Sequence, residues 1–349
     1  MDVGKSIIYY EDTGGFPGCF LTWNELQEEP KLSPDIFTHG LHYGRGAFEG
    51  IRAVWGRNPE GLQIINLREH TSRLAQSARY LRLMNINPAE VEDSIIGLIM
   101  QNAKNDYFDP REGCYVRPLV YSDKVITAKG ERRPGLGVYS QEHRKVLAIG
   151  LFPWGAYLER NPRVRVYEDG IASPLRKVKA TANYGFGGLA KDTAKMEGYD
   201  EALITDVSPE RKVLEGGGEN VFEFSKVRNG VRIRTPSTEQ DILPGTKRAV
   251  FIEMLRNHGL TIDECAFPLA EFLEAEAAIF TGTATGVVAI GEVYDPVTGT
   301  RRFFDSDLKL KPGLRLDEVV AEYDRLIHGE EVHPGNRDLQ ARIRRLVQL

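Results

Sequence analysis

The sequence has few cysteines, and the three that it has follow no recognisable pattern. Cys19, Cys114 and Cys265 are odd in number and far apart, which argues against a disulfide framework and against a zinc site. So few thiols are typical of a protein from a reducing compartment. We therefore expect a cytoplasmic protein without structural disulfides and without a metal centre.

Long hydrophobic stretches are also missing. No run of about 18 apolar residues occurs, and the opening stretch "MDVGKSIIYYEDTGG" has no long apolar segment, so we expect neither a membrane span nor a signal peptide. The net charge is −5 at pH 7 and there is no basic block, so nucleic acid is not an expected partner. Local charge must therefore bind any anionic ligand.

What the chain does have is enough length, 349 residues, for about two globular domains. Apolar spacing predicts a mixture of helices and strands with many strands adjacent in the sequence, which favours an α+β fold. The expected helices cover 68–84, 88–106, 246–259, 315–329 and the end of the 330–349 tail, and the expected strands cover 113–121, 144–152, 201–206, 221–225, 231–235 and 277–283.

The stretch "PWGAYLERNP" is rich in aromatic and turn residues and is typical of a linker. We therefore predict a small N-terminal domain at 1–156, a linker at 157–163 and a larger domain at 164–349.

Two lysines in "RKVKATANY", Arg176 to Tyr184, are candidates for covalent chemistry. A lysine attacks a carbonyl only as the free amine, which requires burial or a nearby positive charge. Lys179 precedes the small residues 180–182, against which a flat ring can pack, whereas Lys177 has no such neighbours. Solvated surface lysines are the alternative interpretation of both.

Three later stretches suit a flat, phosphorylated cofactor. "VLEGGGENVFEF" places Glu215 before three glycines, which form either an exposed turn or a bend that brings the carboxylate to a buried partner such as a pyridine nitrogen. "ILPGTKRAV" places the amides of Thr246 and Lys247 at a helix N-terminus, and "IFTGTATG" ends a strand in small hydroxyl residues. Both suit a phosphate, to which Arg73 would add charge.

In this order, "KATANY", "EGGGENVF", "LPG" before a helix and "TGTATG" resemble the class IV aminotransferases, which are fold-type IV enzymes that use pyridoxal 5'-phosphate (PLP). "THGLHYGRGAFEGIRA", "LREHTSRL", "YVRP" and "FPWGAYL" narrow the resemblance to the branched-chain amino-acid aminotransferases. The resemblance runs from about residue 20 to about residue 295. It implies a homodimer whose chains each have a small α/β domain and a larger pseudo-barrel domain.

The resemblance also implies roles for individual residues. Lys179 would bind PLP as a Schiff base and carry the proton between the substrate Cα and the cofactor. The other cofactor-binding residues would be Arg73, Tyr184, Glu215, Thr246, Lys247 and Thr283. The substrate-binding residues would be Tyr43, Phe48, Gly50, Arg52, Tyr115, Arg117, Tyr157, Thr283 and Ala284.

The implied reaction is reversible transfer of an amino group between leucine, isoleucine or valine and 2-oxoglutarate, an activity of branched-chain amino acid biosynthesis. A mostly aromatic pocket with arginine at its edge suits both an apolar side chain and a second carboxylate. The arginines of that edge are Arg52 and Arg117, with Tyr115 beside them.

This sequence departs from the family pattern at several points, and a different activity stays open. Thr246-Lys247 follow "LPG" where an aliphatic residue and a threonine are usual, and the 122–145 segment, interpreted as a loop, is longer than expected. These departures suit a class IV transaminase for aromatic amino acids, other L-amino acids or primary amines. A PLP-dependent lyase of the aminodeoxychorismate type and a non-enzymatic binding protein are also compatible with the sequence.

Overall fold

The computed structural model describes residues 6–13, 18–28, 36–127, 129, 131–139, 142–153, 158–169 and 173–349. The chain forms two compact units, and both mix helices and strands, which confirms the α+β class. Unit 1 comprises Met1–Trp154, Val178–Ala182 and Ile343–Leu349, and unit 2 comprises Gly155–Lys177 and Asn183–Arg342. Within the described ranges, no helix combines the length and the hydrophobicity that a membrane span needs.

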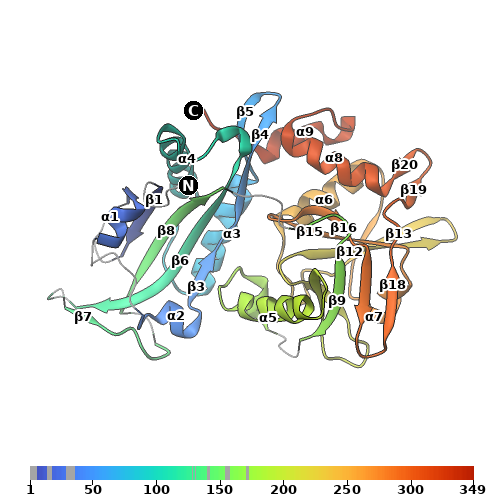
Figure 1. The fold of residues 1–349 in the computed structure, drawn as a ribbon, viewed down its shortest axis with the longest axis horizontal. Coiled ribbons are helices and arrows are strands. Elements are labelled where there is room, and N and C mark those ends of the chain that lie inside the picture. Colours follow the sequence, from blue (N-terminus) through green and yellow to red (C-terminus); the bar gives the residue numbers. More distant parts are fainter. Residues whose placement is uncertain are drawn as a thin grey trace. The chain divides into compact units, whose positions relative to one another are not determined.

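Unit 1 is built on one sheet, which has nine strands in the described part of the chain and the order β2-β1-β8-β6-β4-β5-β21, with β3 and β7 also paired to β6. Figure 1 labels its central strands β8, β6 and β4. The strands are β1 (Ile7–Asp12), β2 (Cys19–Thr22), β3 (Gly46–Phe48), β4 (Ile51–Arg57), β5 (Glu60–Ile65), β6 (Cys114–Ile126), β7 (Arg132–Arg133), β8 (His143–Phe152) and β21 (Arg344–Leu346). The helices of the unit are α1 (Trp23–Glu28), α2 (His39–Tyr43), α3 (Leu67–Tyr80) and α4 (Pro88–Lys104), with a 3-10 turn at Pro110–Glu112.

The two helices predicted at 68–84 and 88–106 are confirmed as α3 and α4. Asn87 caps α4, because its side chain accepts a hydrogen bond from the Ala89 amide at 3.1 Å, and Pro88 follows at the first helical position. Both helices bury their apolar stripe: Leu74 and Ile95 are fully buried.

The two faces of the central strands have different surroundings. Side chains alternate along a strand, so Val116 and Val120 of β6 share one face with their β8 neighbours and are fully buried. The opposite face carries Tyr115, Arg117 and Leu119. This second face holds several residues of the predicted site.

Two segments of unit 1 differ from the sequence-based expectation. The tail was expected to end in a helix, but α9 (Arg337–Ile343) is followed by β21, which pairs with β5. The 122–145 segment is not simply a loop, because β6 continues to Ile126 and then pairs with β7.

Unit 2 is built on two sheets, each with five strands among the described residues, where the resemblance implies a pseudo-barrel. The first has the order β11-β10-β9-β17-β18 and the second β14-β13-β12-β15-β16. The strands of the first are β9 (Arg163–Glu168), β10 (Glu201–Thr205), β11 (Val213–Gly216), β17 (Glu292–Asp295) and β18 (Thr300–Phe303), and those of the second are β12 (Asn220–Val227), β13 (Gly230–Thr235), β14 (Ile262–Glu264), β15 (Ala277–Gly282) and β16 (Gly286–Ala289). The remaining elements are α5 (Asn183–Met196), α6 (Thr246–Asn257), α7 (Leu269–Glu274), α8 (Leu316–His328), the pair β19 (Lys309–Lys311) and β20 (Leu314–Arg315), and 3-10 turns at Pro174–Lys177 and Pro334–Asn336.

The strands predicted between 201 and 283 and the helices predicted at 246–259 and 315–329 are confirmed in unit 2. The end of α8 follows the expected chemistry, because Gly329 adopts φ 71°, a left-handed conformation that favours glycine. Apolar side chains from both sheets, including Val164, Phe280 and Val293, form one buried cluster with α7.

Candidate active site

Lys179 lies in the short segment of the second half that belongs to unit 1. The segment follows the edge of β3: Ala47 and Ala180 form an antiparallel bridge. The Phe48 amide donates to the Lys179 carbonyl at 3.1 Å, and the Lys179 amide donates to the Ser77 hydroxyl of α3 at 3.1 Å. These bonds fix the backbone of Lys179 against β3 and α3.

The side chain of Lys179 is in an environment that favours the free amine. Its Nζ lies 4.9 Å from the centre of the Phe48 ring. Burial, and then the positive charge of Arg73, lower the pKa of Lys179 to about 8. Lys177 differs, because its Nζ donates to the Glu239 carbonyl at 3.0 Å. Of the two lysines, Lys179 is the one whose surroundings suit covalent chemistry.

Arg73 is held by a buried network. Its Nε and Nη2 donate to the two carboxylate oxygens of Glu49 at 2.6 and 2.9 Å, and the His70 ring lies 2.7 Å from the same carboxylate. Glu49 and His70 are fully buried. Burial opposes ionisation of Glu49, but the charges of Arg73 and His70 outweigh burial and hold its pKa well below the ordinary value.

Aromatic residues and arginines gather on β3, β4 and β6. The Arg117 guanidinium lies 4.6 Å from the centre of the Phe48 ring, and its Nη2 donates to the Tyr115 hydroxyl at 2.9 Å. Arg52 is the register partner of Tyr115. Gly50 makes room for Tyr115, because a Cβ at this position would lie 1.8 Å from the Tyr115 hydroxyl oxygen and would displace that ring. Unit 1 thus brings Phe48, Gly50, Arg52, Tyr115 and Arg117 together near the segment of Lys179.

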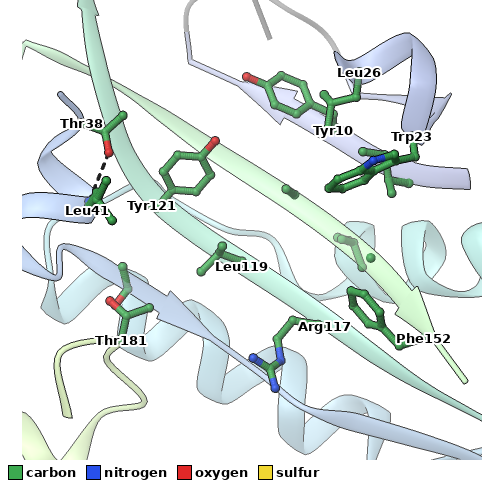
Figure 2. Close-up of a pocket in the computed structure, with 16 residues that line it drawn as sticks. Tyr10, Trp23, Leu26, Thr38, Leu41, Arg117, Leu119, Tyr121, Phe152 and Thr181 are labelled. Carbon is green, nitrogen blue, oxygen red and sulfur yellow. Dashed lines mark hydrogen bonds between the residues drawn. The ribbon is translucent and has the colours of Figure 1, made fainter. Parts of the chain in front are cut away.

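A largely apolar cavity of about 440 Å³ adjoins this group, and Figure 2 shows it. Tyr10, Trp23, Leu119, Tyr121 and Phe152 contribute most of its large side chains. Among the described residues, Arg117 is the charged residue that lines it. The cavity therefore offers hydrophobic surface next to one cation.

Two predicted substrate-binding residues, Tyr43 and Tyr157, are not part of this group in the described structure. Tyr43, at the end of α2, is 43% exposed, and its hydroxyl accepts a hydrogen bond from the Gly137 amide at 3.1 Å. It is therefore held against the chain after β7. Tyr157 lies outside the described residues.

Glu215 lies at the end of β11 in unit 2. Its Oε2 accepts a hydrogen bond from the Leu243 amide at 3.1 Å, and its Oε1 lies 3.9 Å from Nη1 of Arg176. The side chain of Asn220 donates to the Leu243 carbonyl at 2.9 Å and lies 3.5 Å from the same Oε2. These three groups, two of them neutral, help to fix the carboxylate in place.

The other predicted residues of unit 2 stand at turns and helix starts. Thr246 and Lys247 are buried in the first turn of α6, whose N-cap is Gly245. A Cβ on Gly245 would lie 2.0 Å from Oδ1 of Asn220, which links this helix start to Glu215. Thr283 and Ala284 form the turn between β15 and β16, and Tyr184 lies in the first turn of α5.

Several residues that shape these sites were not predicted. Glu49 and His70 lie inside quoted motifs, but their sequence neighbours give no sign that they meet at Arg73. Ser77, Arg176 and Asn220 likewise act through contacts with residues far along the chain or across a turn. A polar residue inside an otherwise apolar strand or helix stripe is the sequence signal that could have indicated these buried polar contacts.

Comparison with known proteins is consistent with this geometry. Residues 46–293 match the family model described as amino-transferase class IV. The chain belongs to this family, and the resemblance inferred from its motifs is confirmed. It is 34% identical over 275 residues to a probable branched-chain-amino-acid aminotransferase of Aquifex aeolicus, which covers 76% of this chain and 80% of the relative. It is 31% identical over 278 residues to the branched-chain-amino-acid aminotransferase of Pseudomonas aeruginosa, which covers 77% and 82%.

Solved structures show the same fold. The branched-chain aminotransferase of Thermoproteus uzoniensis, crystallised with norvaline, superposes with a TM-score of 0.77 at 26% identity and covers 98% of this chain and 100% of that one. The branched-chain amino acid aminotransferase of Thermobaculum terrenum, crystallised in its PLP form, superposes with a TM-score of 0.75 at 22% identity and covers 100% of both chains. The chain therefore has the fold of the fold-type IV aminotransferases.

Proposed function

We propose that this chain is a PLP-dependent branched-chain amino-acid aminotransferase that uses 2-oxoglutarate as the amino acceptor. The observation that carries the proposal is the Lys179 amine, whose pKa is lowered to about 8 by burial and Arg73 and which stands in the family's lysine motif. Roughly a tenth of such an amine is uncharged at pH 7, far more than for an ordinary lysine.

The residues present fit PLP by their chemistry. Unit 1 supplies an amine that is partly uncharged near neutral pH and an aromatic ring, Phe48, beside it. Unit 2 supplies a fixed carboxylate, Glu215, for a ring nitrogen, and the first turn of α6 for a phosphate. When bound, PLP would supply an electron sink that stabilises negative charge at the substrate Cα.

Each residue has a defined task in this proposal. Lys179 holds the cofactor and moves the proton at the substrate Cα, for which an amine with a pKa near the working pH is suited. Glu215 keeps the ring nitrogen protonated. Arg73, Thr246, Lys247 and Thr283 hold the phosphate, and Tyr184 orients the ring hydroxyl oxygen.

The substrate side chain would occupy the aromatic group of unit 1. Phe48 and Tyr115 offer apolar surface to leucine, isoleucine or valine. Arg117, with Arg52 nearby, offers a cation to the second carboxylate of glutamate or 2-oxoglutarate. Gly50 leaves room for Tyr115, Tyr43 and Tyr157 add aromatic surface, and the amides of Thr283 and Ala284 hold the substrate α-carboxylate.

We place the enzyme in the cytoplasm as a homodimer. All three cysteines are free thiols, as is usual in a reducing compartment. The homodimer is carried over from the family resemblance, and sedimentation of the purified protein tests it.

A panel of amino donors with 2-oxoglutarate tests the function, with wild type and Lys179→Ala measured together. We expect leucine, isoleucine and valine to be the best donors and the variant to be inactive. A best donor outside this set would favour the alternative of a class IV transaminase for aromatic amino acids, other L-amino acids or primary amines. The apolar cavity beside Arg117 is the observation that supports this alternative. Turnover without any oxo-acid acceptor would indicate a lyase, and wild type that takes up no PLP would contradict the proposal.

A further inference from the structure

Glu219 is a buried acid that joins two turns of unit 2. Its Oε1 accepts a hydrogen bond from the Thr285 hydroxyl at 2.8 Å, and its Oε2 accepts one from the Gly218 amide at 3.0 Å. Its backbone carbonyl accepts from the Gly216 amide at 2.6 Å. One side chain therefore connects the glycine turn after Glu215 to the turn that contains Thr283 and Ala284.

Glycine backbone approaches the side chain of Glu219 from two sides. A Cβ on Gly216 would lie 2.9 Å from its Oε2, and a Cβ on Gly282 would lie 3.2 Å from its Cγ. Glu219 is 3% exposed. Glycines on both sides of the carboxyl group thus allow the two turns to approach it closely.

A second carboxylate, that of Glu201, packs against the same glycine turn. Glu201 of β10 is fully buried and pairs with Lys191 of α5 at 2.6 Å, and a Cβ on Gly217 would lie 2.6 Å from its Oε1. Burial, and then the charge of Glu201, raise the pKa of Glu219 to about 7, while Thr285 and Lys191 oppose that rise. Lys191 already has a carboxylate partner in Glu201, so it does not fully neutralise both acids.

We propose that Glu219 is a positioning residue whose carboxyl group holds the turn after Glu215 and the 283–285 turn in the arrangement that binds PLP. The inference rests on the proposed function, which assigns Glu215 to the ring nitrogen and Thr283 to the phosphate. Ionisation of Glu219 would strengthen the hydrogen bonds that it accepts, but it would also place a second buried negative charge beside Glu201. Because burial and the charge of Glu201 outweigh those hydrogen bonds, ionisation should on balance disfavour this arrangement of the turns.

The test measures the dissociation constant of PLP for Glu219→Gln, Glu219→Ala and Thr285→Val across the pH range on both sides of neutrality. Glutamine has the shape of the neutral acid and no charge. We expect it to bind PLP as wild type does in mild acid and several-fold more tightly than wild type above neutrality. Because each removes the hydrogen bond to Oε1, Glu219→Ala and Thr285→Val should each weaken binding about tenfold. Glu274→Gln, at a peripheral position of the same unit on α7, is the matched control and should follow wild type.

Unfolding of the PLP-free protein gives a second readout. A raised pKa means that wild type loses stability as the pH rises from the unfolded value of about 4.3 to about 7. Glu219→Gln should lack this loss, so its stability relative to wild type should increase over that range. A constant difference between the two proteins across pH, in both measurements, would overturn the inference. If wild type took up no PLP, the proposed function would fall, and the unfolding data alone would decide whether Glu219 is a neutral link.

Discussion

Two charged groups of opposite sign, Arg73 and Glu49, act on the pKa of Lys179. Arg73 lowers the pKa of the amine and Glu49 raises it, and the two are themselves paired through two hydrogen bonds. His70 supports Glu49 from the other side. Glu49 therefore sets how much of the Arg73 charge acts on Lys179, and it also holds the guanidinium in one orientation.

Glu49→Gln should therefore destabilise the protein, because it removes the negative charge that pairs with the buried Arg73. We expect a loss of about 3 kcal/mol at neutral pH in urea unfolding. Because the pKa of Glu49 is lowered by folding, its contribution is present above the unfolded pKa of about 4.3 and is lost as the pH falls below it. The difference in free energy of unfolding between wild type and variant should therefore decrease in acid. Glu69→Gln, exposed on α3, is the control, and equal effects of the two substitutions would contradict the assignment.

Arg117→Gln tests the recognition of the second carboxylate. The substitution keeps hydrogen-bond donors near Tyr115 and Phe48 but removes the charge. We expect the KM for 2-oxoglutarate to rise at least about tenfold while the KM for leucine changes much less. Steady-state kinetics with both substrates measures this, with Arg133→Gln on the exposed β7 as the control. A similar change for both substrates would show that Arg117 has no role in discriminating them.

Among the structural elements, the glycine turn after β11 contains one glycine, Gly217, that is closely packed and another, Gly218, that is not. The backbone of α5 also packs here, because a Cβ on Gly187 would lie 2.4 Å from the Gly217 carbonyl oxygen. The close packing of these two backbone segments therefore explains why glycine occupies positions 187 and 217, which composition alone does not reveal.

Gly217→Ala and Gly218→Ala should differ in stability for this reason. The new methyl group of the first would lie 2.6 Å from Glu201 Oε1, whereas the second has no atom of the described chain within 4 Å. We expect Gly217→Ala to cost about 1–3 kcal/mol and Gly218→Ala to stay within about 0.5 kcal/mol. Chemical denaturation of both variants is the measurement, and equal stabilities would refute the steric account.

Local pattern was sufficient to predict the longer helices and several of the longer strands, but not most of the short strands or the long-range pairing. α3, α4, α6 and α8 have clear periodicity and end signals, so their existence and approximate bounds follow from the sequence. β21 was missed, because its three residues become a strand only by pairing with β5, which lies near the other end of the chain. The candidate site shows the same division: the motif residues were predicted, but the contact of Glu49 and His70 with Arg73 depends on the fold.

At the level of the whole molecule, two segments from the second half of the chain belong to unit 1. Unit 1 needs 178–182 beside β3 and 343–349 beside β5. Ala180 is fully buried, and Ile343 and Val347 are nearly so. The sheet of unit 1 is therefore complete only after the entire chain has been made.

A fragment that ends at Trp154 should consequently not fold as unit 1 does. Without the two later segments, the edges of β3 and β5 are exposed and the Asn66 amide loses its hydrogen bond to the Ile343 carbonyl. We expect the fragment to bind a hydrophobic dye and to unfold without a cooperative transition, while the full chain unfolds cooperatively. A fragment with a sharp transition would show that unit 1 is stable alone.

The central claim concerns one amine, and trapping it tests the claim most directly. The PLP-loaded protein is reduced with borohydride and digested, and the labelled peptide is identified by mass spectrometry, with Lys179→Ala treated in parallel. The account predicts that the label is on Lys179 in wild type and that the variant carries none. A label on Lys177 or any other lysine, or no label at all, would contradict it.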